Sequence, residues 1–173
     1  SREIPATKPA VITIGKFAGG DAPNIIPNEV VMEGTIRALD KEVGEFIFDR
    51  MKDIVESTAK MFRGEAKLIE LSSVPPLTND TELAKEVTSY VKDLVGEKAV
   101  CLFEGGGMGS EDFASYSYEV PSVYLMLGAG TKQENPLYGE PMHNEKVVFN
   151  EDVLPTGAAM HAYSAIMWLK NNK

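Results

Sequence analysis

A short proline-containing segment, Ser72-Ser73-Val74-Pro75-Pro76, most constrains how this chain folds, because the pattern of apolar residues changes across it. Before it, stretches typical of strand, strand, helix and strand follow one another, and after it helices and strands alternate. Proline lacks a backbone N–H donor and favours an extended residue before it, so the pair is typical of a connection. The sequence therefore predicts two structural parts, residues 1–71 and residues 72–173.

The first part has the pattern of a helix packed on an antiparallel sheet. The expected elements are two strands, a helix and a third strand, over residues 10–17, 29–38, 41–62 and 65–71. Side chains along the second strand alternate between its two faces, which places Arg37 on the face opposite Ile36. Asp40 is positioned to cap the helix. We therefore expect a compact α+β domain.

The second part is typical of an α/β fold. The expected elements are a helix from Asn79 to Gly96, a strand over 98–103, a loop over 104–113, a strand over 122–127 and a helix over 151–170. Asn79 and Glu82 resemble a capping box. Two strands make a thin sheet, so we expect central strands to be missing from this chain and an apolar sheet edge to be exposed.

Composition excludes some classes of partner. The formal net charge of −9 disfavours nucleic acid and anionic membrane surfaces. The chain contains no apolar stretch long enough to span a bilayer. Its one cysteine, Cys101, lies in an apolar run, and a buried free thiol suits a reducing compartment, so we expect a cytoplasmic protein.

Four places carry candidate chemistry, each with a simpler alternative. Asn24 and Arg37 are suited to hold a carboxylate or a developing oxyanion, although a polar turn and a solvated arginine would look the same. Gly109 and Ser110 lie in a glycine-rich loop that lets a substrate approach the backbone, or that only turns tightly. The loop has neither the lysine of a Walker A motif nor dinucleotide-binding spacing.

The chain has two histidines, and they differ in position. His143 lies in a loop after a predicted buried strand, where α/β folds carry active sites, although a solvated loop histidine is the commoner case. His161 shares a helix face with apolar residues, which predicts a satisfied core histidine.

Four ordered segments together resemble the aminoacylase and carboxypeptidase family of two-zinc hydrolases. They are GKFAGGDAPNIIPNEVVMEGTIRALD at 15–40, GSEDFASY at 109–116, VPSVYLMLGAG at 120–130 and MHNEKVVFNEDVLPTGAAM at 142–160. The nearest branch is the N-acyl amino acid amidohydrolases, which includes hippurate hydrolases and plant auxin-conjugate hydrolases.

The resemblance implies that residues 1–71 are the later part of a lid that forms a homodimer. Residues 72–173 would then be the C-terminal segment of the catalytic domain. Asn24 and Arg37 match lid residues that hold the substrate, and Gly109 with Ser110 matches a loop lining its pocket. His143 matches the last ligand of a two-metal site, expected to hold zinc, with manganese or cobalt as alternatives.

In that family paired metals activate a bridging water, and a carboxylate moves its proton to the leaving nitrogen. The resemblance therefore implies hydrolysis of the amide bond of N-acyl amino acids or small peptide-like conjugates by the parent enzyme. The other metal ligands and the general base are expected upstream, so we predict that this chain alone is inactive. The alternative is a non-enzymatic dimerisation or small-molecule-binding module.

Overall fold

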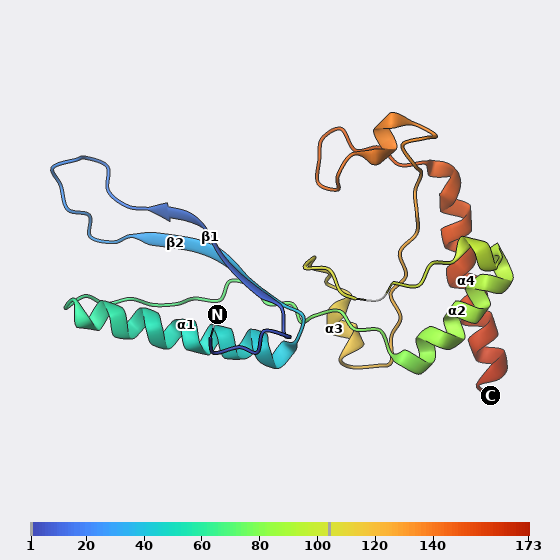
Figure 1. The fold of residues 1–173 in the computed structure, drawn as a ribbon, viewed down its shortest axis with the longest axis horizontal. Helices are drawn as coiled ribbons and strands as arrows, with labels where there is room; N and C mark the ends of the chain where they lie inside the picture. Colours follow the sequence, from blue (N-terminus) through green and yellow to red (C-terminus); the bar gives the residue numbers. More distant parts are fainter. Residues whose placement is uncertain (1, 104) are drawn as a thin grey trace. The chain divides into compact units, whose positions relative to one another are not determined.

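A computed structural model describes residues 2–103 and 105–173 (Figure 1). Ser1 and Glu104, the first residues of the predicted lid segment and of the predicted loop, lie outside the described residues. The described residues form two compact units, residues 2–77 with 105–115, and residues 78–103 with 116–173. The predicted boundary between residues 71 and 72 stays a prediction about the whole protein. Within this chain, the boundary between the two compact units falls after Leu77, and the glycine-rich loop belongs to the first unit.

The sheet of the first unit is an antiparallel hairpin of β1 (Ala10–Ala18) and β2 (Val31–Ala38) (Figure 1). Its register is interrupted between Ile14 and Lys16, so Gly15 forms a bulge. Gly34 lies opposite Ile14, where a Cβ atom would come within 2.3 Å of the Thr13 carbonyl oxygen. Only glycine fits at position 34 without a backbone shift.

Helix α1 (Lys41–Met61) packs against β2, which confirms the predicted helix on an antiparallel sheet. Asp40 caps it by accepting a hydrogen bond from the Val43 N–H at 3.1 Å. The hydrogen bond from Lys8 at 2.7 Å and the Val43 N–H both lower the pKa of Asp40. Val43 is buried on the packed side of the helix. The predicted third strand over residues 65–71 is wrong, because that segment forms no ladder with the hairpin.

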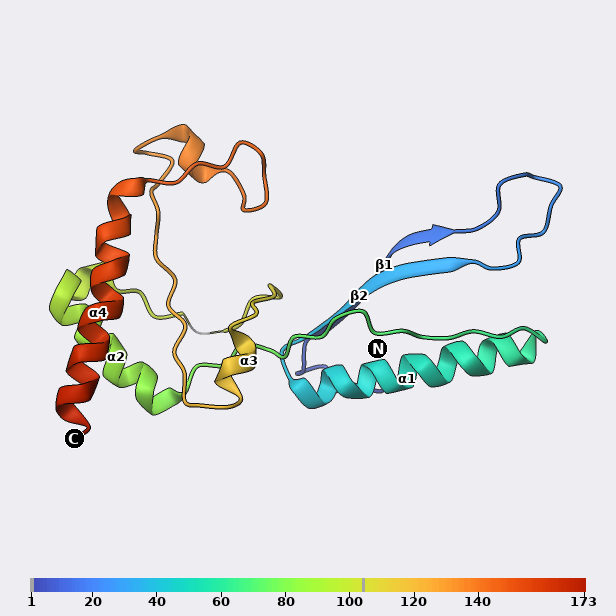
Figure 2. The same ribbon diagram turned by 180° about the vertical axis from the view of Figure 1, so that it is seen from behind.

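The second unit contains α2 (Thr81–Val95) and α4 (Leu154–Asn171), which lie side by side (Figure 2). Tyr90 is buried between them, where its hydroxyl donates to Glu86 and accepts from Asn171 at 2.9 Å. Burial, and then the hydrogen bond to Glu86, raises the pKa of Tyr90. The short helical segments of the chain are η1 (Glu97–Ala99), α3 (Ala114–Ser117), η2 (Pro136–Gly139) and η3 (Glu151–Val153).

The strands predicted over residues 98–103 and 122–127 are wrong. Residues 97–99 form the single turn η1, and the rest of both segments has no regular secondary structure. A strand needs a neighbouring backbone to complete its ladder, and no described segment provides one here. Cys101 is accordingly exposed, so its predicted burial is wrong and no longer supports a reducing compartment.

The predicted cap of α2 also needs correction. Asp80, not Asn79, caps the helix by accepting from the Leu83 N–H at 2.8 Å. The Asn79 amide instead donates to the Tyr124 carbonyl at 3.0 Å and accepts from the Tyr124 N–H at 2.7 Å. The Asn79 side chain therefore bonds both the N–H and the C=O of Tyr124, as the backbone of a neighbouring strand would. Of the described helices, none combines the length and apolar character that a bilayer crossing requires.

Candidate functional site

Arg37 lies near the C-terminal end of β2, paired with Val11 across the hairpin. Its neighbours Ile36 and Ala38 are half-buried, whereas the Arg37 side chain is exposed on the other face. The Arg37 guanidinium donates from Nη1 to the backbone carbonyl of Met108 at 2.6 Å. The structure therefore brings Arg37 to the glycine-rich loop that contains two other predicted site residues.

The loop itself packs against the end of β2. A Cβ atom on Gly106 would lie 3.3 Å from the Leu39 side chain, so glycine allows the close approach. Gly105 has a φ of 117°, which favours glycine. Gly109 and Ser110 are exposed, and the space around Gly109 is open. A guanidinium beside an exposed glycine-rich loop is an arrangement that can hold a carboxylate.

Asn24 lies elsewhere on the first unit. It is exposed in the connection between the strands, which leaves the hairpin at the end where Ala18 pairs with Val31. Arg37 is at the opposite end, six residues after Val31, which corresponds to roughly 20 Å along a strand. Within this chain, Asn24 and Arg37 are not brought together.

His143 lies in the second unit, in a loop whose two ends are joined. The Asn150 N–H donates to the Ala129 carbonyl at 2.9 Å. His143 is exposed and has a φ of 64°, a left-handed conformation that is uncommon outside glycine. The Asn144 side chain accepts from the Lys146 N–H at 2.9 Å and so orders the turn that follows. A histidine held in this conformation is a candidate for function, because such backbone strain collects at functional sites.

The described residues do not form a metal centre on their own. Among residues 2–103 and 105–173, no three His, Cys, Asp or Glu side chains lie close enough together to hold an ion. His143 thus offers one imidazole, and the two-metal site implied by the resemblance does not fit the described residues alone. His161 is exposed on α4, so its predicted place in the core is wrong, because no described element covers that side chain.

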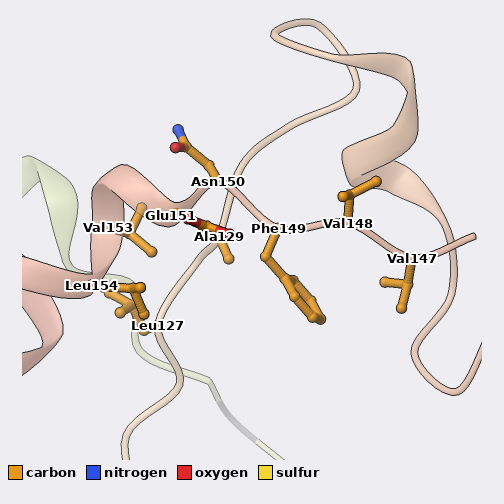
Figure 3. Close-up of a pocket in the computed structure, with 9 residues that line it drawn as sticks. All are labelled: Leu127, Ala129, Val147, Val148, Phe149, Asn150, Glu151, Val153 and Leu154. Carbon is orange, nitrogen blue, oxygen red and sulfur yellow. The ribbon is translucent and has the colours of Figure 1, made fainter.

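Two features, one in each unit, were not predicted from the sequence. The Met108 carbonyl has no sequence signal, because every residue carries one. The second is a pocket of about 420 Å³ in the second unit. The apolar run Val147-Val148-Phe149, which lines it, is the sequence feature that could have indicated it. Its lining is Leu127, Ala129, Val147, Val148, Phe149, Asn150, Glu151, Val153 and Leu154 (Figure 3). The pocket is therefore mainly apolar and adjoins the end of the loop that carries His143.

Comparisons with known proteins cover nearly the whole chain. Residues 6–166 match the model of peptidase family M20/M25/M40. An uncharacterised hydrolase from Sinorhizobium fredii is 37% identical over 155 residues, which cover 89% of this chain and 37% of that protein. An IAA-amino acid hydrolase from Arabidopsis thaliana is 33% identical over 174 residues, which cover 98% of this chain and 38% of that protein.

A solved structure supports the predicted fold class. It is the dinuclear metal binding peptidase of the M20 family from Bacillus subtilis, with a TM-score of 0.75 and 24% identity. The match covers 93% of this chain and 42% of that one. The chain thus spans about two fifths of the length of the relatives that it matches. From the family match and the fold together, we conclude that the chain belongs to peptidase family M20/M25/M40.

Proposed function

We propose that the whole protein containing this chain hydrolyses the amide bond of N-acyl amino acids or similar small conjugates. The observation that carries the proposal is the Arg37 guanidinium beside the exposed glycine-rich loop. An N-acyl amino acid ends in a carboxylate, and arginine is the side chain best suited to hold one in a fixed orientation. The name of the Arabidopsis relative, an IAA-amino acid hydrolase, supports the same substrate class.

Arg37 would bind the substrate carboxylate, and Gly109 and Ser110 would lie beside the bound substrate. Changing Arg37 to alanine in the whole protein is expected to raise KM roughly tenfold to 150-fold, because a hydrogen bond to a charged group contributes about 1.5–3 kcal/mol. Steady-state kinetics with an N-benzoyl amino acid provide the measurement. Arg37→Lys is the matched variant, since it keeps the charge and loses the planar fork. An unchanged KM in both variants would remove Arg37 from the site.

His143 would supply one ligand to a two-metal centre whose other ligands are not among the described residues. Zinc is the expected metal, with manganese or cobalt as alternatives. Metal content of the whole protein tests this assignment, with His161→Ala as the control because it removes the other histidine. We expect His143→Ala to lower the bound metal per chain and His161→Ala to leave it unchanged. Equal metal content in the two variants would sink the assignment.

The whole protein would form a homodimer through the first unit. Apolar side chains along both strands of the hairpin stay exposed, namely Ile12, Ile14, Phe17, Val31 and Met32. Exposed apolar surface of this kind is typical of an interface. Light scattering is expected to give twice the mass of one chain, and the mass of a single chain would contradict the dimer. A cytoplasmic location stays a prediction.

A second candidate function is a non-enzymatic dimerisation or small-molecule-binding module. The observation that favours it is the absence of a metal-binding group among the described residues. Metal titration of the whole protein, followed by calorimetry with an N-acyl amino acid, separates the two functions. Binding of the small acid without any metal requirement, and without turnover, would favour the binding module.

A further inference from the structure

The left-handed backbone of His143 needs neighbouring residues to hold it. At a φ of 64° the Cβ atom of any residue other than glycine crowds the following carbonyl oxygen. Such a conformation persists only where the surrounding structure determines it. His143 is exposed, and it makes no hydrogen bond of its own to any of residues 2–103 and 105–173. The contacts that hold its backbone must therefore come from adjacent residues of the loop.

Asn144 bonds the chain on both sides of His143. Its Nδ2 group donates to the Glu140 carboxylate, with 3.4 Å between the Nδ2 and Oε2 atoms. Its Oδ1 atom accepts from the Lys146 N–H at 2.9 Å, and its carbonyl accepts from the Val147 N–H at 3.1 Å. Because rotation about φ of His143 would carry Asn144 away from Glu140, this hydrogen bond opposes such a rotation.

Glu140 is a suitable anchor for the Asn144 side chain because it ends the short helix η2. Its N–H donates to the Leu137 carbonyl at 3.5 Å, and Asn135 closes the other end of η2 by accepting from the Leu137 N–H at 3.0 Å. Tyr138 of η2 lies directly on Gly130, where an added Cβ atom would overlap the tyrosine ring. Glu140 is also half-buried. The acceptor of the Asn144 amide is therefore held in place by packing within the loop.

We propose that Asn144 and Glu140 are positioning residues for His143, and that their hydrogen bond keeps the His143 backbone left-handed. A change of φ to the usual negative range would turn the Cα–Cβ bond of His143, and the imidazole with it, relative to the loop. The hydrogen bond thus sets the direction in which the loop presents its imidazole. The consequence for catalysis rests on the proposed function, in which His143 acts at the active site, whereas the effect on φ does not.

Reversing the direction of this hydrogen bond in the whole protein tests the proposal. Asn144→Asp keeps the acceptor for the Lys146 N–H but places a second carboxylate beside Glu140 in place of the amide donor. Adding Glu140→Gln supplies an amide donor for the new carboxylate, so the double variant regains the bond with its direction reversed. Asn135→Asp is the matched control. Asn135 also accepts from the N–H two residues on, and in the part of the chain that the structure describes its amide donates to no carboxylate.

Two measurements separate positioning from stability. Crystal structures of protein freed of metal, so that no ligand fixes the imidazole, give the φ of His143, and thermal unfolding checks that each variant folds. Steady-state kinetics with N-benzoylglycine give kcat and KM. We expect Asn144→Asp to lose the positive φ and to lower kcat about tenfold to a hundredfold, the effect of misplacing an active-site group by about 1 Å. The change in KM should be smaller, because Arg37 would still bind the substrate carboxylate.

The double variant should regain the positive φ and most of the lost kcat, and Asn135→Asp should match the wild type in both. An Asn144→Asp variant that melts lower but keeps its φ and kcat would overturn the proposal, since Asn144 would then serve only the stability of the loop. A double variant that regains neither φ nor kcat would overturn it as well. If the wild type does not turn over N-benzoylglycine, the proposed function fails, whereas the φ values still decide whether Asn144 positions His143.

Discussion

Replacing His143 with glycine separates the stability of its loop from the chemistry of its imidazole. His143 has a φ of 64°, and a left-handed conformation costs a residue other than glycine about 1–2 kcal/mol. Glycine loses about 0.5–1 kcal/mol more conformational free energy on folding than alanine does. The difference predicts that the folded state of His143→Gly is about 0–1.5 kcal/mol more stable. If His143 is a ligand, the same variant should nevertheless lose metal.

The assay compares His143→Gly with Arg63→Gly in the whole protein. Arg63 follows α1 and has a φ of 63°, so its replacement relieves the same strain at a residue that is not proposed to bind metal. In metal-free protein both variants are expected to melt at the wild-type temperature or up to about 6 °C above it. Only His143→Gly should lower the bound metal. A His143→Gly variant that melts well below the wild type, or that keeps its full metal content, would refute the reasoning.

Two further predictions concern stability. Gly34→Ala would place a Cβ atom 2.3 Å from the Thr13 carbonyl oxygen, so denaturant unfolding should show a loss of about 1–3 kcal/mol, whereas Gly15→Ala, with nothing within 4 Å, should change little. Because the pKa of Tyr90 is raised, its contribution to stability is complete below about pH 10 and is lost as pH rises through the raised pKa. Tyr90→Phe should therefore flatten the alkaline fall in melting temperature, and an unchanged fall would contradict the role assigned to the Tyr90–Glu86 contact.

Local elements of the fold could be predicted well from the sequence. The helix expected over residues 41–62 is observed at Lys41–Met61 with the predicted cap, because apolar spacing and capping depend on neighbours in the chain. The strands expected over 98–103 and 122–127 failed for the opposite reason. A strand depends on a partner backbone that can lie anywhere in a protein, and an apolar run does not show whether one is present.

The candidate site residues also include features that could be predicted from the sequence and features that could not. Alternation along β2 correctly placed Arg37 on the face opposite Ile36, because side chains in a strand alternate. The partner of Arg37 is a main-chain carbonyl, which no side-chain pattern could have revealed. The left-handed conformation of His143 is also a property of its loop and has no signature in the residue type. The roles of Arg37 and His143 stay predictions until they are measured.

Hydrolysis of an N-benzoyl amino acid by the whole protein, before and after treatment with a chelator, tests the central claim most directly. The account predicts hydrolysis that is lost with the metal and returns when a divalent metal is added back. Turnover that is unaffected by the chelator, or no turnover of any N-acyl amino acid in fully metal-loaded protein, would contradict it.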